Sequence, residues 1–247
     1  MSETLRMWIE IIFNLIYLCF VWGYVAAMIS RRSSVALSDR PVANRFSWAF
    51  ALLAFGDSGH VGFRVIAYAL GDLNAKVYLF GKPLSLVGAG ALMTAITVTF
   101  FYVLILDIWR LRFNKPLGWF GWFLLLAAMI RLLLLIPAAN HWEMITPPQP
   151  WSLIRNLPLL IQGVGVMVLI LRDGYSAKDR TFIAIGWLIF LSYLCYTPVI
   201  LFVQIYPLIG MLMIPKTLAY LAIAVVAYQK LFRLNKTKDF VTNPLAG

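Results

Sequence analysis

The chain has 247 residues, of which 62% are hydrophobic and 13% are charged, with a mean hydropathy of +0.84 and a net charge of +11. A soluble domain of this length has too small an interior to bury so many apolar side chains, so the composition excludes an ordinary soluble protein. The positive charge does not call for a nucleic-acid partner, because membrane proteins place basic residues in their cytoplasmic loops.

Seven apolar stretches follow one another along the chain. A helix rises 1.5 Å per residue, so about 20 apolar residues cross about 30 Å of hydrocarbon. The stretches are separated by segments typical of turns, such as RFNKP at 112–116. We therefore expect one all-α domain over residues 1–247, an integral membrane seven-helix bundle. Its predicted transmembrane spans are 7–30, 46–70, 84–109, 117–138, 152–172, 181–204 and 207–232.

The distribution of Lys and Arg predicts the orientation of this bundle. The segments after the first, third and fifth spans, together with the C-terminal tail, hold 14 of the 21 basic residues. The opposite side holds only Arg6, Lys76 and Lys82. Basic loops stay in the cytoplasm, so we expect the N-terminus outside and the C-terminus in the cytoplasm, with the lipid bilayer as a partner.

The second span carries Asp57, His60 and Arg64 at spacing i, i+3 and i+7, which places them on one stripe of a helix. Lys216 of the last span falls at about the same depth as Asp57, about 15 Å from the start of its helix. An isolated ionised side chain at the bilayer centre costs several kcal/mol, so we expect Asp57 and Lys216 to pair. Such a pair could simply hold two helices in register. His60, which changes charge near physiological pH, favours a ligand or proton site instead.

Two further arginines belong to the spans and fall in their outer halves. Arg131 is too deep to reach the membrane surface easily, whereas Arg155 is expected to extend to the lipid headgroups. Together with Arg64 they would suit an anionic ligand that enters from outside. Glu10 and Asn14 of the first span would add polar groups to the same region.

The sixth and third spans offer weaker candidates. Tyr193 and Tyr196 lie one turn apart and are taken as candidate ligand-binding residues, although tyrosines at this spacing more often serve packing. The third span has small residues that allow a neighbouring helix to approach closely. Its Thr94 and Thr97 either bond to carbonyls of their own helix or face the pocket.

Catalytic and metal sites find little support in the sequence. In the run DSGH, Ser58 would point about 100° away from Asp57 and about 200° away from His60 on a helix, which excludes a Ser–His–Asp triad. Asp57 and His60 could supply two metal ligands, but the other histidine, His141, lies in an outer loop. A membrane-embedded lipid-modifying enzyme is therefore an alternative for which we find neither a nucleophile nor a metal site.

Three stretches resemble a group of small, uncharacterised bacterial integral membrane proteins with seven helices. They are LLAFGDSGHVGFR at 52–64, LMTAITVTFFYVL at 92–104 and PLIGMLMIPKTLAY at 207–220. The distinctive parts are GDSxH…R in the second span and IPKT in the last. This resemblance implies a multi-pass protein of the bacterial cytoplasmic (inner) membrane and supports the choice of site residues, but it carries no activity. Where this chain has Gly59 and Gly62, those proteins have a bulky aromatic residue and a proline.

A weaker likeness is to microbial rhodopsins, which share seven helices, an outside N-terminus and a mid-membrane lysine on the last helix. It implies retinal as a cofactor, with Lys216 as the Schiff-base lysine and Asp57 as its counter-ion. The third span, however, lacks the carboxylate and the tryptophan expected of those pumps, and Lys216 directly follows Pro215.

We thus expect a polar pocket between spans 1, 2, 4, 5, 6 and 7 that opens outward. The pocket would bind a small anionic ligand or a lipid, and the protein would act as a receptor-like sensor or as a carrier. The candidate ligand-binding residues are Asp57, His60, Arg64, Arg131, Tyr193, Tyr196 and Lys216.

Overall fold

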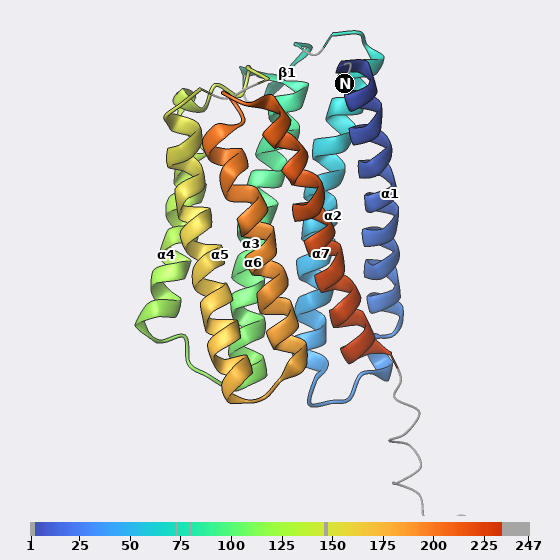
Figure 1. Ribbon diagram of the computed structural model, residues 1–247, viewed down its shortest axis with the longest axis vertical. Helices are drawn as coiled ribbons and strands as arrows, with labels where there is room; N and C mark the ends of the chain where they lie inside the picture. Colours follow the sequence, from blue (N-terminus) through green and yellow to red (C-terminus); the bar gives the residue numbers. More distant parts are fainter. Residues whose placement is uncertain (1–2, 73, 80, 146–147, 234–247) are drawn as a thin grey trace, which may run out of the picture.

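The computed structural model describes residues 3–72, 74–79, 81–145 and 148–233. Within these residues the chain forms a bundle of seven α-helices that stand side by side (Figure 1). The all-helical architecture predicted from the sequence is confirmed. The helices are α1 (Glu3–Ser30), α2 (Arg40–Ala69), α3 (Leu86–Phe113), α4 (Gly118–Leu134), α5 (Trp151–Ser176), α6 (Arg180–Phe202) and α7 (Met213–Ala227).

The two ends of the bundle differ (Figure 1). One end, named here the hairpin end, carries the start of α1 and two antiparallel strands, β1 (Lys76–Leu79) and β2 (Lys82–Ser85). The sequence predicted only a turn in this segment. A hairpin forms because Gly81 adopts a φ of +75°, which suits the tight reversal between the two strands.

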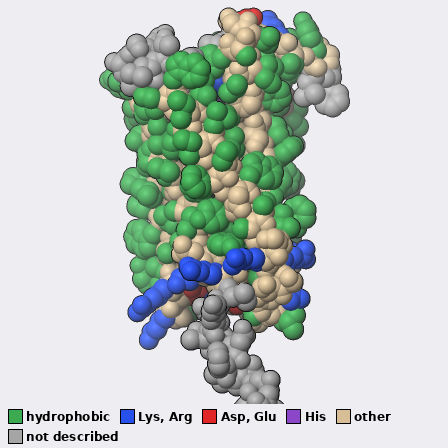
Figure 2. Space-filling view, turned by 90° about the vertical axis from the view of Figure 1, so that its right-hand side faces the viewer, with side chains coloured by type: hydrophobic (Ala, Val, Ile, Leu, Met, Phe, Trp, Pro, Cys, Tyr) green, Lys and Arg blue, Asp and Glu red, His purple; other side chains and the backbone are tan. Residues whose placement is uncertain are grey.

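The opposite end, named here the basic end, carries the segments that follow α1, α3 and α5 and the end of α7. Figure 2 shows hydrophobic side chains over the middle of one face and a row of Lys and Arg side chains near the basic end. Exposed basic residues at the ends of α1 and α7 include Arg31, Arg32, Lys230 and Arg233. The surface is therefore apolar along the helices and positively charged at one end.

Several helices are long and apolar enough to cross a membrane. This is typical of a multi-pass membrane protein. Helix α4 is apolar but has only 17 residues, and α2 has 30 residues but carries four charged side chains. The five described stretches that satisfy both criteria are Ile11–Ser30, Leu86–Phe113, Trp151–Ser176, Arg180–Phe202 and Pro207–Phe232.

Several helix boundaries differ by four or more residues from the predicted spans, and the last span is divided. Helix α2 begins at Arg40 rather than 46, with Pro41 in its first turn, where a missing N–H is tolerated. Helix α4 ends at Leu134 rather than 138, shortly before Pro137. The last span is divided into a 3-10 helix η3 (Pro207–Leu212), α7 and a π-helical turn η4 (Tyr228–Phe232).

Glycines allow α2 and α3 to approach closely. A Cβ atom at Gly56 would overlap the side chain of Thr97, and one at Gly90 would lie 2.8 Å from the Cα of His60. Thr94 uses this proximity, because its hydroxyl donates a hydrogen bond to the carbonyl of Gly56 at 2.9 Å. The predicted close approach of a helix to the third span is thus present, with α2 as the neighbour.

Candidate functional site

The half of the bundle next to the hairpin end contains a partly open cavity of about 400 Å³. All seven α-helices contribute to its lining, and Trp142 and η3 border it toward the hairpin end. Six of the seven residues predicted from the sequence line it, namely Asp57, His60, Arg64, Arg131, Tyr196 and Lys216. Residues from four different helices are therefore brought together as the sequence predicted.

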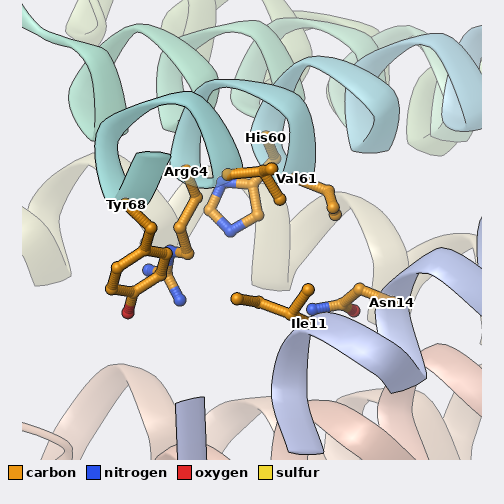
Figure 3. A pocket seen from close by; sticks show the side chains of 7 residues that line it. Ile11, Asn14, His60, Val61, Arg64 and Tyr68 are labelled. Carbon is orange, nitrogen blue, oxygen red and sulfur yellow. The ribbon is translucent and has the colours of Figure 1, made fainter. Parts of the chain in front are cut away.

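A small crevice between α1 and α2 adjoins the cavity (Figure 3). Its volume is about 10 Å³, close to the space of one water molecule. In Figure 3, His60, Arg64 and Tyr68 extend from α2 toward Ile11 and Asn14 of α1. Asn14, His60 and Arg64 also line the cavity, so a single layer of side chains separates the two spaces.

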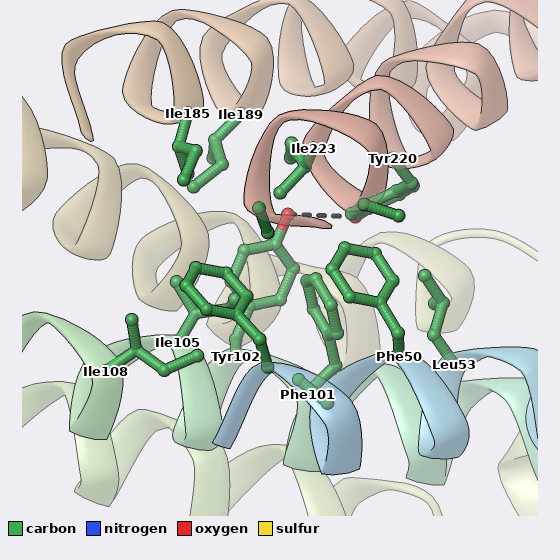
Figure 4. Packing of buried hydrophobic residues seen from close by; sticks show 14 of the residues in the cluster. Phe50, Leu53, Phe101, Tyr102, Ile105, Ile108, Ile185, Ile189, Tyr220 and Ile223 are labelled. Carbon is green, nitrogen blue, oxygen red and sulfur yellow. Dashed lines mark hydrogen bonds between the residues drawn. The ribbon is translucent and has the colours of Figure 1, made fainter. Parts of the chain in front are cut away.

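The other half of the bundle is filled by packed side chains (Figure 4). The rings of Phe50 and Phe101 lie 5.7 Å apart, and those of Phe101 and Tyr102 lie 5.2 Å apart, in edge-to-face contacts. The hydroxyls of Tyr102 and Tyr220 share a hydrogen bond of 2.8 Å. Because Tyr220 also lines the cavity, these side chains form its floor.

Asp57 and Lys216 do not form the predicted direct ion pair, although both lie in the described part of the chain. The carboxylate of Asp57 accepts a hydrogen bond from the hydroxyl of Tyr17 at 2.9 Å. Lys216 places its Nζ 4.3 Å from the ring centroid of Tyr196 and 5.6 Å from that of Tyr220, in cation–π contacts. The two side chains line the same cavity without touching.

Arg131 is the most unusual side chain of the cavity. It is 2% exposed, and its Nε and Nη1 atoms are buried with no hydrogen-bond partner among the described residues. Buried polar atoms almost always have a partner, and buried guanidinium groups are nearly always paired. The structure thus presents a cation with unused donors beside an internal cavity.

The prediction that Arg155 extends to lipid headgroups is wrong, because its side chain is buried. Its side chain is 7% exposed, its guanidinium carbon lies 4.3 Å from the ring centroid of Trp142, and its Nη1 donates to the side-chain oxygen of Asn140 at 3.1 Å. Both partners belong to the segment after α4. Arg155 is turned inward because this segment offers it a stacking surface and an acceptor.

The segment after α4 is fixed over the hairpin end by several hydrogen bonds. The carbonyl of Trp142 accepts bonds from the backbone N–H and the hydroxyl of Ser85, both at 3.1 Å, and its indole donates to the carbonyl of Leu135 at 3.1 Å. Asn140, which is fully buried, donates to the carbonyls of Leu134 and Pro137. Through Trp142, the described part of this segment borders the cavity.

Tyr193 is the predicted site residue that does not line the cavity. It is 4% exposed, and its hydroxyl donates to the carbonyl of Leu159 at 3.1 Å. Its ring occupies the space beside Gly163, where any Cβ atom would overlap it. Tyr193 therefore packs α6 against α5, while Tyr196, one turn later, reaches the cavity.

Sequence reasoning missed some lining residues. Tyr17 lies one turn after Asn14 and so shares its face of α1, a spacing that could have identified it. Asn156 accepts a hydrogen bond from the hydroxyl of Tyr196 at 3.3 Å. Thr94 lines the cavity, whereas Thr97 donates to the carbonyl of Thr94 in its own helix. The side chain of Glu10 lies outside the described residues.

The described residues do not assemble a catalytic triad or a metal site. Ser58 is turned toward α1, where its Oγ accepts a hydrogen bond from Trp22 at 3.0 Å and donates to the carbonyl of Ala54. No group of three or more His, Cys, Asp and Glu in the described part could hold a metal ion. In the loop after α4, the backbone amide of Glu143 and the His141 ring 2.8 Å away hold the pKa of Glu143 below its usual range.

The charge of the cavity is strongly positive. Among its described lining residues, Arg64, Arg131, Arg155 and Lys216 are cationic, and Asp57 is the carboxylate. No family model, no curated protein and no solved structure matches the chain. The resemblances to uncharacterised bacterial membrane proteins and to microbial rhodopsins therefore remain expectations. The side chains that line the cavity are the evidence for a function.

Proposed function

We propose that the chain is a seven-span membrane protein that binds a small anionic molecule or an anionic headgroup in its outer cavity, as a receptor-like sensor or a carrier. In this proposal α2 and α4 also cross the bilayer. Helix α2 is about 45 Å long, and its Asp57, His60 and Arg64 line the cavity. Helix α4 is about 26 Å long and close to the hydrocarbon thickness.

The proposed orientation places the basic end in the cytoplasm and the hairpin end outside. It rests on the 14 of 21 basic residues that the sequence assigns to one side and on the exposed arginines and lysines at the basic end. The cavity would then face the outer side of a bacterial cytoplasmic membrane, while its packed floor would close it toward the cytoplasm.

One observation carries the binding proposal: a buried guanidinium with two unpartnered donors lines a cavity that also holds the cations of Arg155 and Lys216 and the single carboxylate of Asp57. Such an excess of charge is costly in an apolar bundle unless an anion compensates it. Carboxylate and phosphate groups match the planar donor arrangement of arginine and can accept from two of its nitrogens. Arg131 would hold the anion, with Arg64, Arg155 and Lys216 providing further positive potential.

Thermal unfolding of the purified protein in detergent tests the proposal. We expect inorganic phosphate or glycerol 3-phosphate to raise the Tm above that in sodium chloride of equal ionic strength, because a ligand that binds only the folded state stabilises it. The rise should disappear in Arg131→Met. It should persist in Arg112→Met, which removes one positive charge at the basic end, outside the cavity.

If phosphate, glycerol 3-phosphate and a simple carboxylate such as succinate all leave the Tm of the unaltered protein unchanged, the cavity does not bind anions of this kind. An equal rise in Arg131→Met and in the unaltered protein would place the binding elsewhere. Either result would contradict the proposal.

The retinal-binding alternative has one observation in its favour, since Lys216 lies in the cavity beside two tyrosine rings. Its expected counter-ion, Asp57, is hydrogen-bonded to Tyr17 instead. Adding all-trans-retinal to the purified protein distinguishes the two functions. We expect no visible absorption band, and a band that is lost in Lys216→Ala would establish the alternative.

A further inference from the structure

The crevice between α1 and α2 places polar groups on a side of the bundle that is otherwise apolar. It is lined by Asn14, His60, Arg64 and Tyr68 together with aliphatic residues. The exposed residues on either side of it along the same two helices are large and hydrophobic, and they include Ile12, Leu15, Phe55 and Ile66. A polar slot of this kind would be costly in contact with hydrocarbon alone.

In the proposed seven-span arrangement, the crevice lies where lipid headgroups meet the acyl chains. Helix α2 ends at Ala69, so Tyr68, Arg64 and His60 lie about 2, 8 and 14 Å below the hairpin end of the helix. Headgroup regions add about 5–8 Å on each side of the hydrocarbon core. The crevice therefore runs from the level of lipid headgroups into the upper part of the acyl chains.

The crevice lies directly beside the cavity, and Trp142 borders the cavity toward the hairpin end. Asn14, His60, Val61 and Arg64 line both spaces, and the Nδ1 atom of His60 is buried without a hydrogen-bond partner among the described residues. At the hairpin end, Trp142 is fixed by bonds to Ser85 of β2 and to Leu135 of its own segment.

Two hydrogen bonds between α1 and α2 lie deeper than the crevice. Hydrogen bonds join Tyr17 to Asp57 and Trp22 to Ser58, and both lie on the basic side of the crevice. The turns of α1 around Ile11 can therefore separate from α2 while these bonds stay intact. Such a movement would widen a space that now has room for about one water molecule.

We infer that the cavity takes the oxyanion head of an amphiphile, which enters sideways between α1 and α2 while its acyl chain stays in the bilayer. The inference rests on the proposed function and names the class of ligand. A cavity of about 400 Å³ is at the small end of the range for drug-sized ligands, about 300–1,000 Å³. It has room for a phosphate or carboxylate head with its linker, and the crevice gives the attached chain a path to the lipid.

Binding of two probes that share one head tests the inference. Dioleoyl phosphatidic acid in mixed micelles presents a phosphate head with chains, and glycerol 3-phosphate presents the same head without them. Dioleoyl phosphatidylcholine is the zwitterionic reference. We expect the purified protein to bind phosphatidic acid in preference to phosphatidylcholine, and Arg131→Met to lose both phosphate-bearing probes.

Two neighbouring substitutions on α2 separate lateral entry from other effects. Val65 lines the crevice, whereas the next residue, Ile66, is exposed on the apolar surface. We expect Val65→Trp to weaken phosphatidic acid binding about tenfold or more, and to change glycerol 3-phosphate binding by less than about twofold. Ile66→Trp should alter neither. Retained glycerol 3-phosphate binding in Val65→Trp shows that the cavity is still folded.

The possible failures of the two proposals are distinguishable. If glycerol 3-phosphate binds in a manner that depends on Arg131 but phosphatidic acid does not bind, the ligand is a free anion and lateral entry is wrong. If Val65→Trp and Ile66→Trp weaken phosphatidic acid equally, or neither does, Arg64 and Tyr68 serve only as interfacial anchors and the inference fails. If neither probe binds the unaltered protein, the proposed phosphate chemistry fails with it.

Discussion

Replacing Arg131 by methionine should make the ligand-free protein more stable, which is unusual for a substitution inside a helical bundle. The guanidinium is buried, and two of its nitrogens have no hydrogen-bond partner among the described residues. Methionine has a similar length and a flexible apolar side chain, so it can occupy the same space without these unsatisfied donors.

The magnitude follows from the two unpartnered donors. Each buried donor without a partner costs about 1–3 kcal/mol. Methionine loses some contacts of the guanidinium, so we expect a net gain of about 2 kcal/mol in the free energy of unfolding. For a chain of this size, this gain raises the Tm by about 4–8 °C.

The assay is thermal unfolding in detergent at low ionic strength, without added phosphate or carboxylate. Arg112→Met is the matched control, because the Arg112 guanidinium contacts Asp39 at 2.9 Å and Asp179 at 2.8 Å at the basic end. Its loss should lower the free energy of unfolding by up to about 2 kcal/mol, since each of the two partly exposed ion pairs contributes up to about 1 kcal/mol. The two Arg→Met substitutions should therefore shift the Tm in opposite directions.

A Tm for Arg131→Met that is unchanged or lower than that of the unaltered protein would refute this reasoning. It would mean that the guanidinium of Arg131 is already satisfied in the ligand-free protein, so that no anion is needed to compensate it. The stability change and the loss of the response to phosphate are separate measurements, and a site adapted to a ligand should show both.

Two further predictions concern contacts around the cavity. Tyr17→Phe and Asp57→Asn should couple by about 1–3 kcal/mol in a double-mutant cycle of unfolding free energies, whereas Asp57→Asn and Lys216→Met should couple less, because no direct bond joins them. The opposite ranking would mean that Asp57 and Lys216 do meet. Gly90→Ala should lower the unfolding free energy by about 1–3 kcal/mol, because its Cβ would press on the backbone of α2. Gly62→Ala, with open space around it, should raise it by about 0.5–1 kcal/mol, and equal effects of the two alanines would contradict the described packing.

The sequence predicted most of the cavity for a simple physical reason. Charged residues inside apolar helices must face one another or an internal space, so Asp57, Arg64, Arg131 and Lys216 could be assigned to one pocket from their depth alone. Depth does not give the lateral distance between two helices, however. The predicted contact between Asp57 and Lys216 therefore failed, although both reach the same cavity.

The remaining errors involve contacts that depend on a second segment. Arg155 is turned inward by Trp142 and Asn140. These partners lie outside α5, so the sequence of the helix that carries Arg155 does not predict them. Tyr193 and Tyr196 have the same residue type and nearly the same face of α6. Their roles differ because Gly163 of the neighbouring helix leaves a space for the ring of Tyr193 only. Such contacts are set by tertiary packing, which local periodicity does not contain.

Tyr220 belongs to both halves of the bundle, since its ring borders the hollow half and its hydroxyl bonds to Tyr102 in the solid half. The solid half keeps the helix spacing constant near the basic end and so acts as a fulcrum. Any widening of the hollow half must then appear as a tilt of the helix ends around this fixed point. A shift of Tyr220 would transmit that tilt to α3 through its bond with Tyr102, and from there toward the opposite face of the membrane.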